Sequence, residues 1–175
     1  MQRILIFANG NLPDLAKARV LLRPEDFILC ADGGTRHALA LGVEPNLVIG
    51  DMDSIEKEQF QQLQVAGAEI ELFPRDKNET DLELAVNKAI GLNPKEIIIV
   101  AALGGRTDQA LANISLLADF RLSIFDIRLD DGVEEIIPCR DQVQIRGRSG
   151  DLVSLIPWGV PVHGVRTGNL KWRLD

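Results

Sequence analysis

The chain has 175 residues and a formal net charge of −7, and 46% of its residues are hydrophobic. This length suits one hydrophobic core with a small appendage at most, and the acidic balance argues against nucleic acid or an anionic membrane as partner. Because no apolar run approaches the ~20 residues that cross a bilayer and the first residues lack a signal-peptide pattern, we expect a cytoplasmic protein.

Strands and helices alternate along the first two-thirds of the chain. Strands are predicted where Ile, Leu and Val gather in short runs, at residues 3–9, 27–32, 46–51, 69–74, 96–103 and 121–129. Several of these runs are almost continuously apolar, which is typical of strands that are covered on both faces.

Helical patterns fill the segments between these strands. Asn11 followed by Pro13 predicts a helix N-cap, and Thr80 with Glu83 predicts a capping box. The helix after Thr80 carries an apolar stripe at i, i+3, i+4 spacing and is expected to stop at Gly91. A second stripe predicts a helix over residues 107–119. This alternation predicts a mostly parallel, three-layer, Rossmann-like α/β sheet.

The pattern changes near residue 130. Residues 130–132, Asp-Asp-Gly, are a turn signal, and the following strand-like pieces are split by Gly and Pro. These pieces are 142–147, 152–158, 162–168 and 170–175. We therefore predict an α/β domain over residues 1–129 and a small, sandwich-like all-β domain over residues 130–175, whose sheet is left unfinished with open edges.

Four polar clusters follow successive predicted strands. They read ADGG (31–34), GDMDS (50–54), RDKNETD (75–81) and GGRTDQ (104–109). Singly, each has an ordinary structural explanation; GDMDS, for example, suits an Asx turn with Ser54 capping the next helix. Ligands of open α/β sheets bind beyond the carboxyl ends of the strands, so we expect all four clusters to converge on one crevice.

The residue types in these clusters suit a magnesium polyphosphate. Carboxylates are hard ligands that Mg²⁺ shares with substrate phosphates; the candidates are Asp32, Asp51, Asp53 and Asp81. Glycines let backbone N–H groups approach phosphate oxygens; the candidates are Gly33, Gly34, Gly104 and Gly105. Positive charge comes from Arg75, Lys77 and Arg106. Two carboxylates ~4 Å apart repel by about 1 kcal/mol in water and about 4 at an effective dielectric of 20, so the close spacing of Asp51 and Asp53 also favours a cation.

The sequence lacks the motifs of several other classes of site. The sequence contains neither the G-x-x-x-x-G-K-[ST] loop nor any G-x-G, and its two histidines and two cysteines have no metal-ligand or triad spacing. Cys30 and Cys139 are expected to be small buried hydrophobes.

In this order, the clusters resemble the motifs of the thiamine pyrophosphokinase family. Members carry D-G-G, G-D-[FM]-D-S, D-K-D-x-T-D and G-G-R-x-D-[HQ] after successive strands. This chain reads ADGGTRHAL, GDMDSI, DKNETDLELA and GGRTDQALANISLL, and its later GDLVSLIPWG and GVRTGNLKW resemble the family's β-domain. The resemblance implies transfer of the diphosphoryl group of ATP to the hydroxyl of thiamine, giving thiamine diphosphate and AMP. It also implies a homodimer whose β-domains form the thiamine site between subunits.

The resemblance also implies roles for individual residues. Mg²⁺ would be held by Asp51, Asp53 and Asp81, with Asp32 near the metal and phosphates. The nucleotide phosphates would be lined by Lys77, Thr80 and Arg106. The nucleotide–thiamine junction would hold Asp108 and Gln109, and Asp32 or Asp108 would orient the alcohol. Such a transfer needs positioning and charge neutralisation more than a covalent nucleophile.

Two departures from the family pattern matter. Asn78 replaces the middle acid of D-K-D, which removes one charge and weakens a second metal site. The family's Gly-x-Ser-x-Asn segment does not follow before residue 175, so we expect either a fragment or an incomplete thiamine pocket. Two alternatives therefore stay open: a diphosphokinase for another alcohol, such as a hydroxymethyl-pterin, and a non-catalytic nucleotide- or thiamine-binding module.

Overall fold

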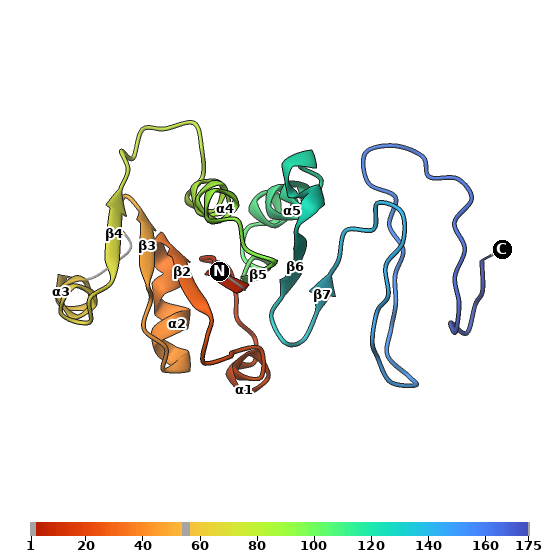
Figure 1. Cartoon of the computed structure of the whole chain (residues 1–175), viewed down its shortest axis with the longest axis horizontal. Coiled ribbons are helices and arrows are strands. Elements are labelled where there is room, and N and C mark those ends of the chain that lie inside the picture. The colour runs from red at the N-terminus through yellow and green to blue at the C-terminus, as the bar shows by residue number, and fades with distance from the viewer. Residues whose placement is uncertain (1–2, 54–56, 175) are drawn as a thin grey trace. The chain divides into compact units, whose positions relative to one another are not determined.

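The computed structural model describes residues 3–53 and 57–174, so Ser54 and its predicted cap lie outside the described residues. The chain divides into two compact units, Met1–Arg140 and Asp141–Asp175. The first unit is a seven-stranded sheet of order β4-β3-β2-β1-β5-β6-β7 with helices on both faces (Figure 1). Its strands are β1 (Arg3–Phe7), β2 (Phe27–Ala31), β3 (Leu47–Gly50), β4 (Glu69–Leu72), β5 (Glu96–Val100), β6 (Asp126–Asp130) and β7 (Glu135–Ile136).

The sheet is parallel from β4 to β6, and only β7 pairs antiparallel, with β6. Strand β1 is buried throughout and contributes side chains to two hydrophobic cores. Ile4 and Ile6 face one side of the sheet, whereas Leu5 and Phe7 face the other. Burying one such side chain contributes about 1.5–3 kcal/mol. The predicted parallel α/β sheet, covered on both faces, is confirmed.

Two helical layers cover the sheet. The helices are α1 (Leu15–Arg19), α2 (Thr35–Leu41), α3 (Lys57–Val65), α4 (Asp81–Leu92) and α5 (Thr107–Leu116), with 3-10 turns η1 (Asp32–Gly34) and η2 (Phe120–Ile124). Side chains of α4, α5 and η2 pack into one core, and those of α1, α2 and α3 pack into the other. Among the described residues, no helix combines the length and apolar character needed to cross a membrane.

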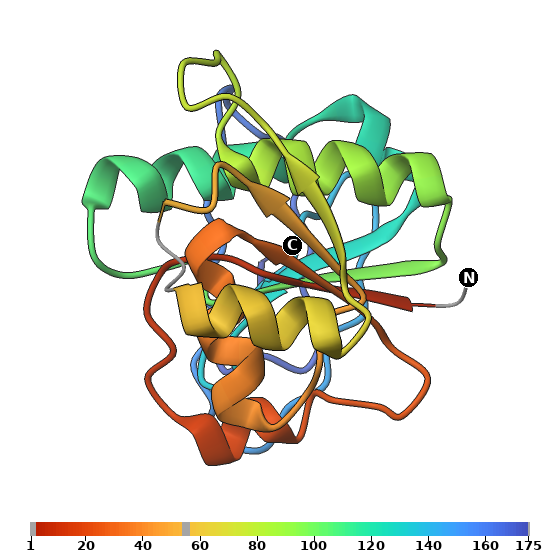
Figure 2. The ribbon, with the colours of Figure 1, turned by 90° about the vertical axis from the view of Figure 1, so that its left-hand side faces the viewer.

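The order of the strands reverses at β1. The chain moves outward from β1 through β2 and β3 to the edge strand β4, then crosses back over the other face to β5, on the far side of β1. Because strands β1 to β6 are parallel, their carboxyl ends share one edge of the sheet. The loops after β1 and β5 lie together at that edge (Figure 2). In such sheets the crevice at the reversal is the usual ligand site.

Helix ends follow the sequence signals in part. The capping box at Thr80 and Glu83 is confirmed, and α4 runs one residue past Gly91 before Asn93 ends it in a left-handed conformation. The predicted cap at Asn11 is wrong: Asp14 caps α1, because its carboxylate accepts from the backbone N–H groups of Ala16 and Lys17.

The segment 121–129 is only partly a strand. Its first residues belong to the 3-10 turn η2, because the Asp119 carboxylate accepts from the Arg121 backbone N–H and starts a turn there. The strand β6 begins at Asp126.

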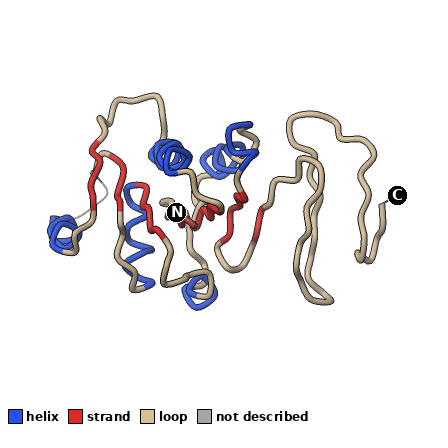
Figure 3. Tube along the Cα trace, viewed as in Figure 1, coloured by secondary structure: helices blue, strands red, loops and turns tan. Residues whose placement is uncertain are grey.

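The second unit is described by itself. Its described residues, 141–174, carry neither helix nor strand, and Figure 3 draws them as loop. The predicted strands are therefore not formed there, since strand backbone groups need a partner to pair with. The side chains of Trp158 and Trp172 are 42% and 77% exposed. In the first unit Cys30 is buried as expected, whereas Cys139 is exposed and that expectation is wrong. The predicted domain limits, 1–129 and 130–175, stay a prediction.

Candidate active site

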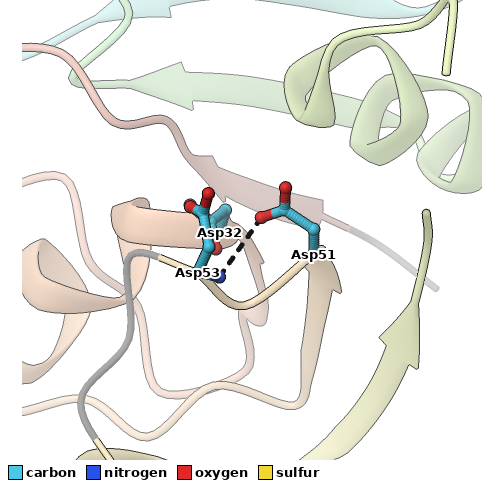
Figure 4. Close-up of side chains that lie close together, drawn as sticks. All are labelled: Asp32, Asp51 and Asp53. Carbon is cyan, nitrogen blue, oxygen red and sulfur yellow. Dashed lines mark hydrogen bonds between the residues drawn. The ribbon is translucent and has the colours of Figure 1, made fainter. Parts of the chain in front are cut away.

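Three carboxylates meet at the carboxyl edge of the sheet. Asp32 follows β2, Asp51 and Asp53 follow the neighbouring strand β3, and one oxygen of each lies within 4.8 Å of the others (Figure 4). Asp32 is buried, Asp51 is half-buried and Asp53 is exposed, so the group opens from the protein toward solvent. The convergence predicted for the first two clusters, ADGG and GDMDS, is confirmed.

Unusual backbone conformations aim these side chains. Asp32 and Met52 both have left-handed φ values, +42° and +61°. The Asp53 backbone N–H donates to Asp51 Oδ1 at 3.2 Å, so the Asx turn of the purely structural explanation does form. That turn and the carboxylate group coexist, because it uses only one oxygen of Asp51 and leaves the rest of the group available.

Gly50 brings a fourth carboxylate close to this group. A β-carbon on Gly50 would lie 2.8 Å from Asp32 Cβ and 3.3 Å from Asp81 Oδ1. Asp81 is the first residue of α4, so the close packing around Gly50 places the helix start beside the end of β2. Asp81 therefore joins the acidic group from a third element.

The acidic group is short of positive charge. Asp32 Oδ1 is buried and has no hydrogen-bond partner among the described residues. Burial raises the pKa of the Asp81 carboxyl above its usual value, an effect that the Lys77 ammonium opposes. The negative charges of Asp32 and Asp51 raise it further. A buried carboxylate without a partner is costly, and hard oxygen donors crowded in this way are the ligand set that Mg²⁺ takes; the residues fit the predicted metal.

The loop after β4 supplies cations to the group. Lys77 Nζ lies 3.0 Å from Asp81 Oδ1 and donates to the Pro74 carbonyl at 3.2 Å, with the Lys77 side chain largely buried. Arg75 Nη2 lies 3.4 Å from Asp53 Oδ2, with both side chains exposed. Exposed pairs of this kind contribute about 0–1 kcal/mol, so Arg75 can leave Asp53 for a ligand at little cost.

Thr80 caps the N-terminus of helix α4. Its hydroxyl accepts from the Glu83 backbone N–H at 3.1 Å, and the Glu83 carboxylate accepts from the Thr80 backbone N–H at 2.7 Å. Thr80 is an exposed residue next to Asp81, and its role toward a nucleotide stays a prediction.

The two glycine pairs differ in character. A β-carbon on Gly34 would lie 2.0 Å from the Phe7 carbonyl oxygen, and one on Gly33 would lie 2.5 Å from the Asn9 side chain. These buried glycines therefore let η1 pack against the end of β1. Gly104 and Gly105 are exposed and left-handed in succession, with φ of +79° and +68°, and this turn leaves backbone groups uncovered for a ligand.

Arg106 and Asp108 pair with each other. Arg106 Nε donates to Asp108 Oδ1 at 3.1 Å, and this guanidinium holds the pKa of the exposed Asp108 carboxyl below its usual range. Both residues lie at the start of α5, followed by the exposed Gln109. The structure thus places the acidic group at β2 and β3, and a separate Arg–Asp pair at the turn after β5.

Sequence reasoning missed the loop after β1. Residues 9–11, Asn-Gly-Asn, follow β1 at the same edge, and their backbone is tied to β5 and α2. The signal was present, because a polar Asn-Gly-Asn break after an apolar run is a further cluster of the kind found after the other strands.

Comparisons with known proteins agree on one family. Residues 18–129 match the family model for the thiamin pyrophosphokinase catalytic domain. A thiamine pyrophosphokinase of Bacillus subtilis is 30% identical over 146 residues, which cover 82% of this chain and 68% of that protein. Thiamine pyrophosphokinase 1 of Oryza sativa subsp. japonica is 30% identical over an alignment that covers 98% of this chain and 73% of that protein.

Solved structures of the same kind share the fold. The crystal structure of the B. subtilis thiamine pyrophosphokinase superposes with a TM-score of 0.64 at 29% identity, covering 73% of this chain. That of Geobacillus thermodenitrificans gives a TM-score of 0.61 at 28% identity. The matched part covers 60% and 59% of those two chains.

Proposed function

This chain belongs to the thiamin pyrophosphokinase family, and on that premise we propose that it transfers the diphosphoryl group of ATP to the hydroxyl of thiamine. The observation that carries the proposal is the acidic group of Asp32, Asp51 and Asp53, whose oxygens lie within 4.8 Å of one another at the carboxyl edge of the sheet. The unpartnered Asp32 Oδ1 supports a cation there, and a magnesium polyphosphate is the ligand that brings one.

The proposed roles are those that the family resemblance implies. Asp51, Asp53 and Asp81 hold Mg²⁺, with Asp32 beside it; when bound, the ion neutralises charge on the phosphates. The nucleotide phosphates are lined by Gly33, Gly34, Lys77, Thr80, Gly104, Gly105 and Arg106. Asp108 and Gln109 lie at the junction of nucleotide and thiamine.

The reaction forms a bond between the hydroxyethyl oxygen of thiamine and the β-phosphorus of ATP. The bond from that phosphorus to the bridging oxygen of the α-phosphate breaks, and AMP leaves with the electron pair. The hydroxyl proton goes to a carboxylate. Of the two candidates, Asp32 is better suited, because Asp108 is paired with Arg106 whereas Asp32 Oδ1 has no partner within the described segments. The remaining work is positioning.

We assign the C-terminal part, residues 130–175, to thiamine binding and homodimer formation. Its support is the apolar character of the described residues 141–174: their exposed large side chains are Val143, Ile145, Leu152, Val153, Leu155, Ile156, Trp158, Val160, Val162, Val165, Trp172 and Leu174. Exposed apolar side chains in this number suit an interaction site, and the predicted strands would form when a second copy supplies partners for pairing. A cytoplasmic location is part of the same proposal.

The test is AMP release from Mg²⁺-ATP with and without thiamine. Thiamine-dependent AMP is expected from the wild type, with at least a hundredfold loss in Asp51→Ala. Asp126→Ala, at the opposite edge of the sheet, is the control and should keep full activity. AMP release with a hydroxymethyl-pterin but not with thiamine would show that the acceptor is a different alcohol from the one proposed. ATP binding without AMP release would make this chain a binding module and overturn the proposal.

A further inference from the structure

The loop after β1 lies at the reversal of the sheet. Strand β1 stands between β2 and β5, and its pairing with β5 continues past the strand ends through bonds from Ala8 N to Val100 O (2.9 Å), Gly10 N to Ala101 O (2.8 Å) and Asn11 N to Leu103 O (2.8 Å). Ligands of open α/β sheets occupy the crevice at this reversal. Residues 9–11 therefore border the crevice, directly beside residues 101–103.

The side chains of Asn9 and Asn11 reach the two halves of the site. The Asn9 carboxamide lies against Gly33, since a β-carbon there would come within 2.5 Å of Asn9 Nδ2. The Asn11 carboxamide lies against Gly104 in the same way, at 2.5 Å from its Nδ2. One carboxamide thus adjoins the turn that carries Asp32, and the other adjoins the turn that precedes Arg106.

Hydrogen bonds hold the backbone of this loop, whereas the side chains of Asn9 and Asn11 are not used in hydrogen bonds among the described residues. Arg36 Nη2 donates to the carbonyls of Asn9 (3.2 Å) and Gly10 (3.1 Å), and His37 Nε2 lies 2.9 Å from the Gly10 oxygen. Within the described ranges the two carboxamides make no hydrogen bond to the protein, and both residues are exposed. Asn11 is not used as a helix cap either, because Asp14 has that role. A rigid backbone that presents unused polar side chains is a preorganised binding element.

We propose that Asn9 and Asn11 donate their carboxamide N–H groups to the polyphosphate of the bound nucleotide. This inference rests on the proposed function and adds two substrate-binding residues to it. Neutral donors suit this place, because the amide binds phosphate oxygens without adding a cation that would compete with Mg²⁺ for the carboxylates. Asn9 serves the end of the polyphosphate near Asp32, and Asn11 serves the end near Gly104.

The test replaces each donor by an acceptor of the same shape. Asn9→Asp and Asn11→Asp are compared with wild type for binding of Mg²⁺ with an ATP analogue that has a methylene bridge between its α- and β-phosphorus, measured by calorimetry. A hydrogen bond to a charged group is worth about ten- to a hundredfold in affinity, so each variant should raise the Kd of the analogue by at least that range. The control, Asn87→Asp on the exposed side of α4, should stay within twofold.

Further readouts separate binding from structure. KM for thiamine and the thermal midpoint should change little, whereas a packing role would lower the midpoint and leave the Kd unchanged. Should an Asp variant lose thermal stability, the Ala variant of that residue gives the measurement, with about a tenfold rise expected. An analogue Kd within twofold of wild type in both Asp variants overturns the inference, as does failure of the wild type to bind the analogue. Wild type that binds the analogue but releases no AMP would overturn the proposed function alone.

Discussion

A β-carbon on Gly50 would lie 2.8 Å from the β-carbon of Asp32, closer than such atoms approach in folded proteins. The glycine at the end of β3 therefore allows the carboxylate at the end of β2 to take its place beside Asp51 and Asp53. The φ of Gly50, +154°, is a second reason for glycine at this position, since residues with a side chain rarely adopt that backbone conformation. The motif glycine has a steric role in building the acidic group, distinct from any contact with phosphate.

Gly50→Ala should disturb the acidic group and the packing beneath it. The added methyl group must push Asp32 away, and overpacking of this kind costs about 1–3 kcal/mol in the free energy of unfolding. Urea denaturation and a Mg²⁺ titration followed by the thermal midpoint would measure both effects. The matched control is Gly91→Ala: Gly91 lies in α4 with open space around its β-carbon position, and alanine there should stabilise by up to about 1 kcal/mol. Equal midpoints and equal Mg²⁺ responses in Gly50→Ala and wild type would contradict the steric role.

Asp32→Asn should stabilise the metal-free protein and weaken its response to Mg²⁺. Removing one charge from the group relieves repulsion of about 1–4 kcal/mol, and asparagine tolerates the left-handed φ of residue 32 at least as well as aspartate. The measurement is the free energy of unfolding in EDTA and in Mg²⁺, for this variant and for Asp126→Asn at the other edge of the sheet. If Mg²⁺ stabilised wild type and Asp32→Asn equally, Asp32 would not belong to the metal site.

His37 should make stability depend on pH below neutrality. Burial lowers the pKa of its imidazole; the hydrogen bond to the Gly10 carbonyl opposes this shift, and the charge of Arg36 adds to it. The unfolded chain, with an ordinary pKa of about 6.5, then binds more protons than the folded one. Stability is therefore complete above that pH and is lost as the pH falls through it toward the folded pKa.

The comparison is wild type against His37→Gln, which retains a donor for the Gly10 carbonyl. Between pH 7.5 and pH 5.5 the wild type should lose more free energy of unfolding than the variant, by less than about 1 kcal/mol because the ring is half-exposed. Parallel losses in the two proteins would show that protonation of His37 does not oppose folding.

The sequence by itself determined the features that depend on neighbours along the chain. Continuous apolar runs predicted buried parallel strands, and Thr80 with Glu83 predicted the start of α4, because periodicity and capping act within a few residues. The carboxyl-edge rule placed the polar clusters on one side of the sheet, since successive parallel strands must end there. The family resemblance of those clusters likewise needed only their order.

Only the tertiary structure decided which of these residues meet. The strand order sets β3 beside β2, so Asp51 and Asp53 reach Asp32, while the turn after β5 lies beyond β1, and there Arg106 pairs with Asp108. The order also puts residues 9–11 between the two halves of the site, a position that depends on which strands pair with β1. Distances between loops depend on the order in which strands pair, and that order is a property of the whole sheet rather than of any segment.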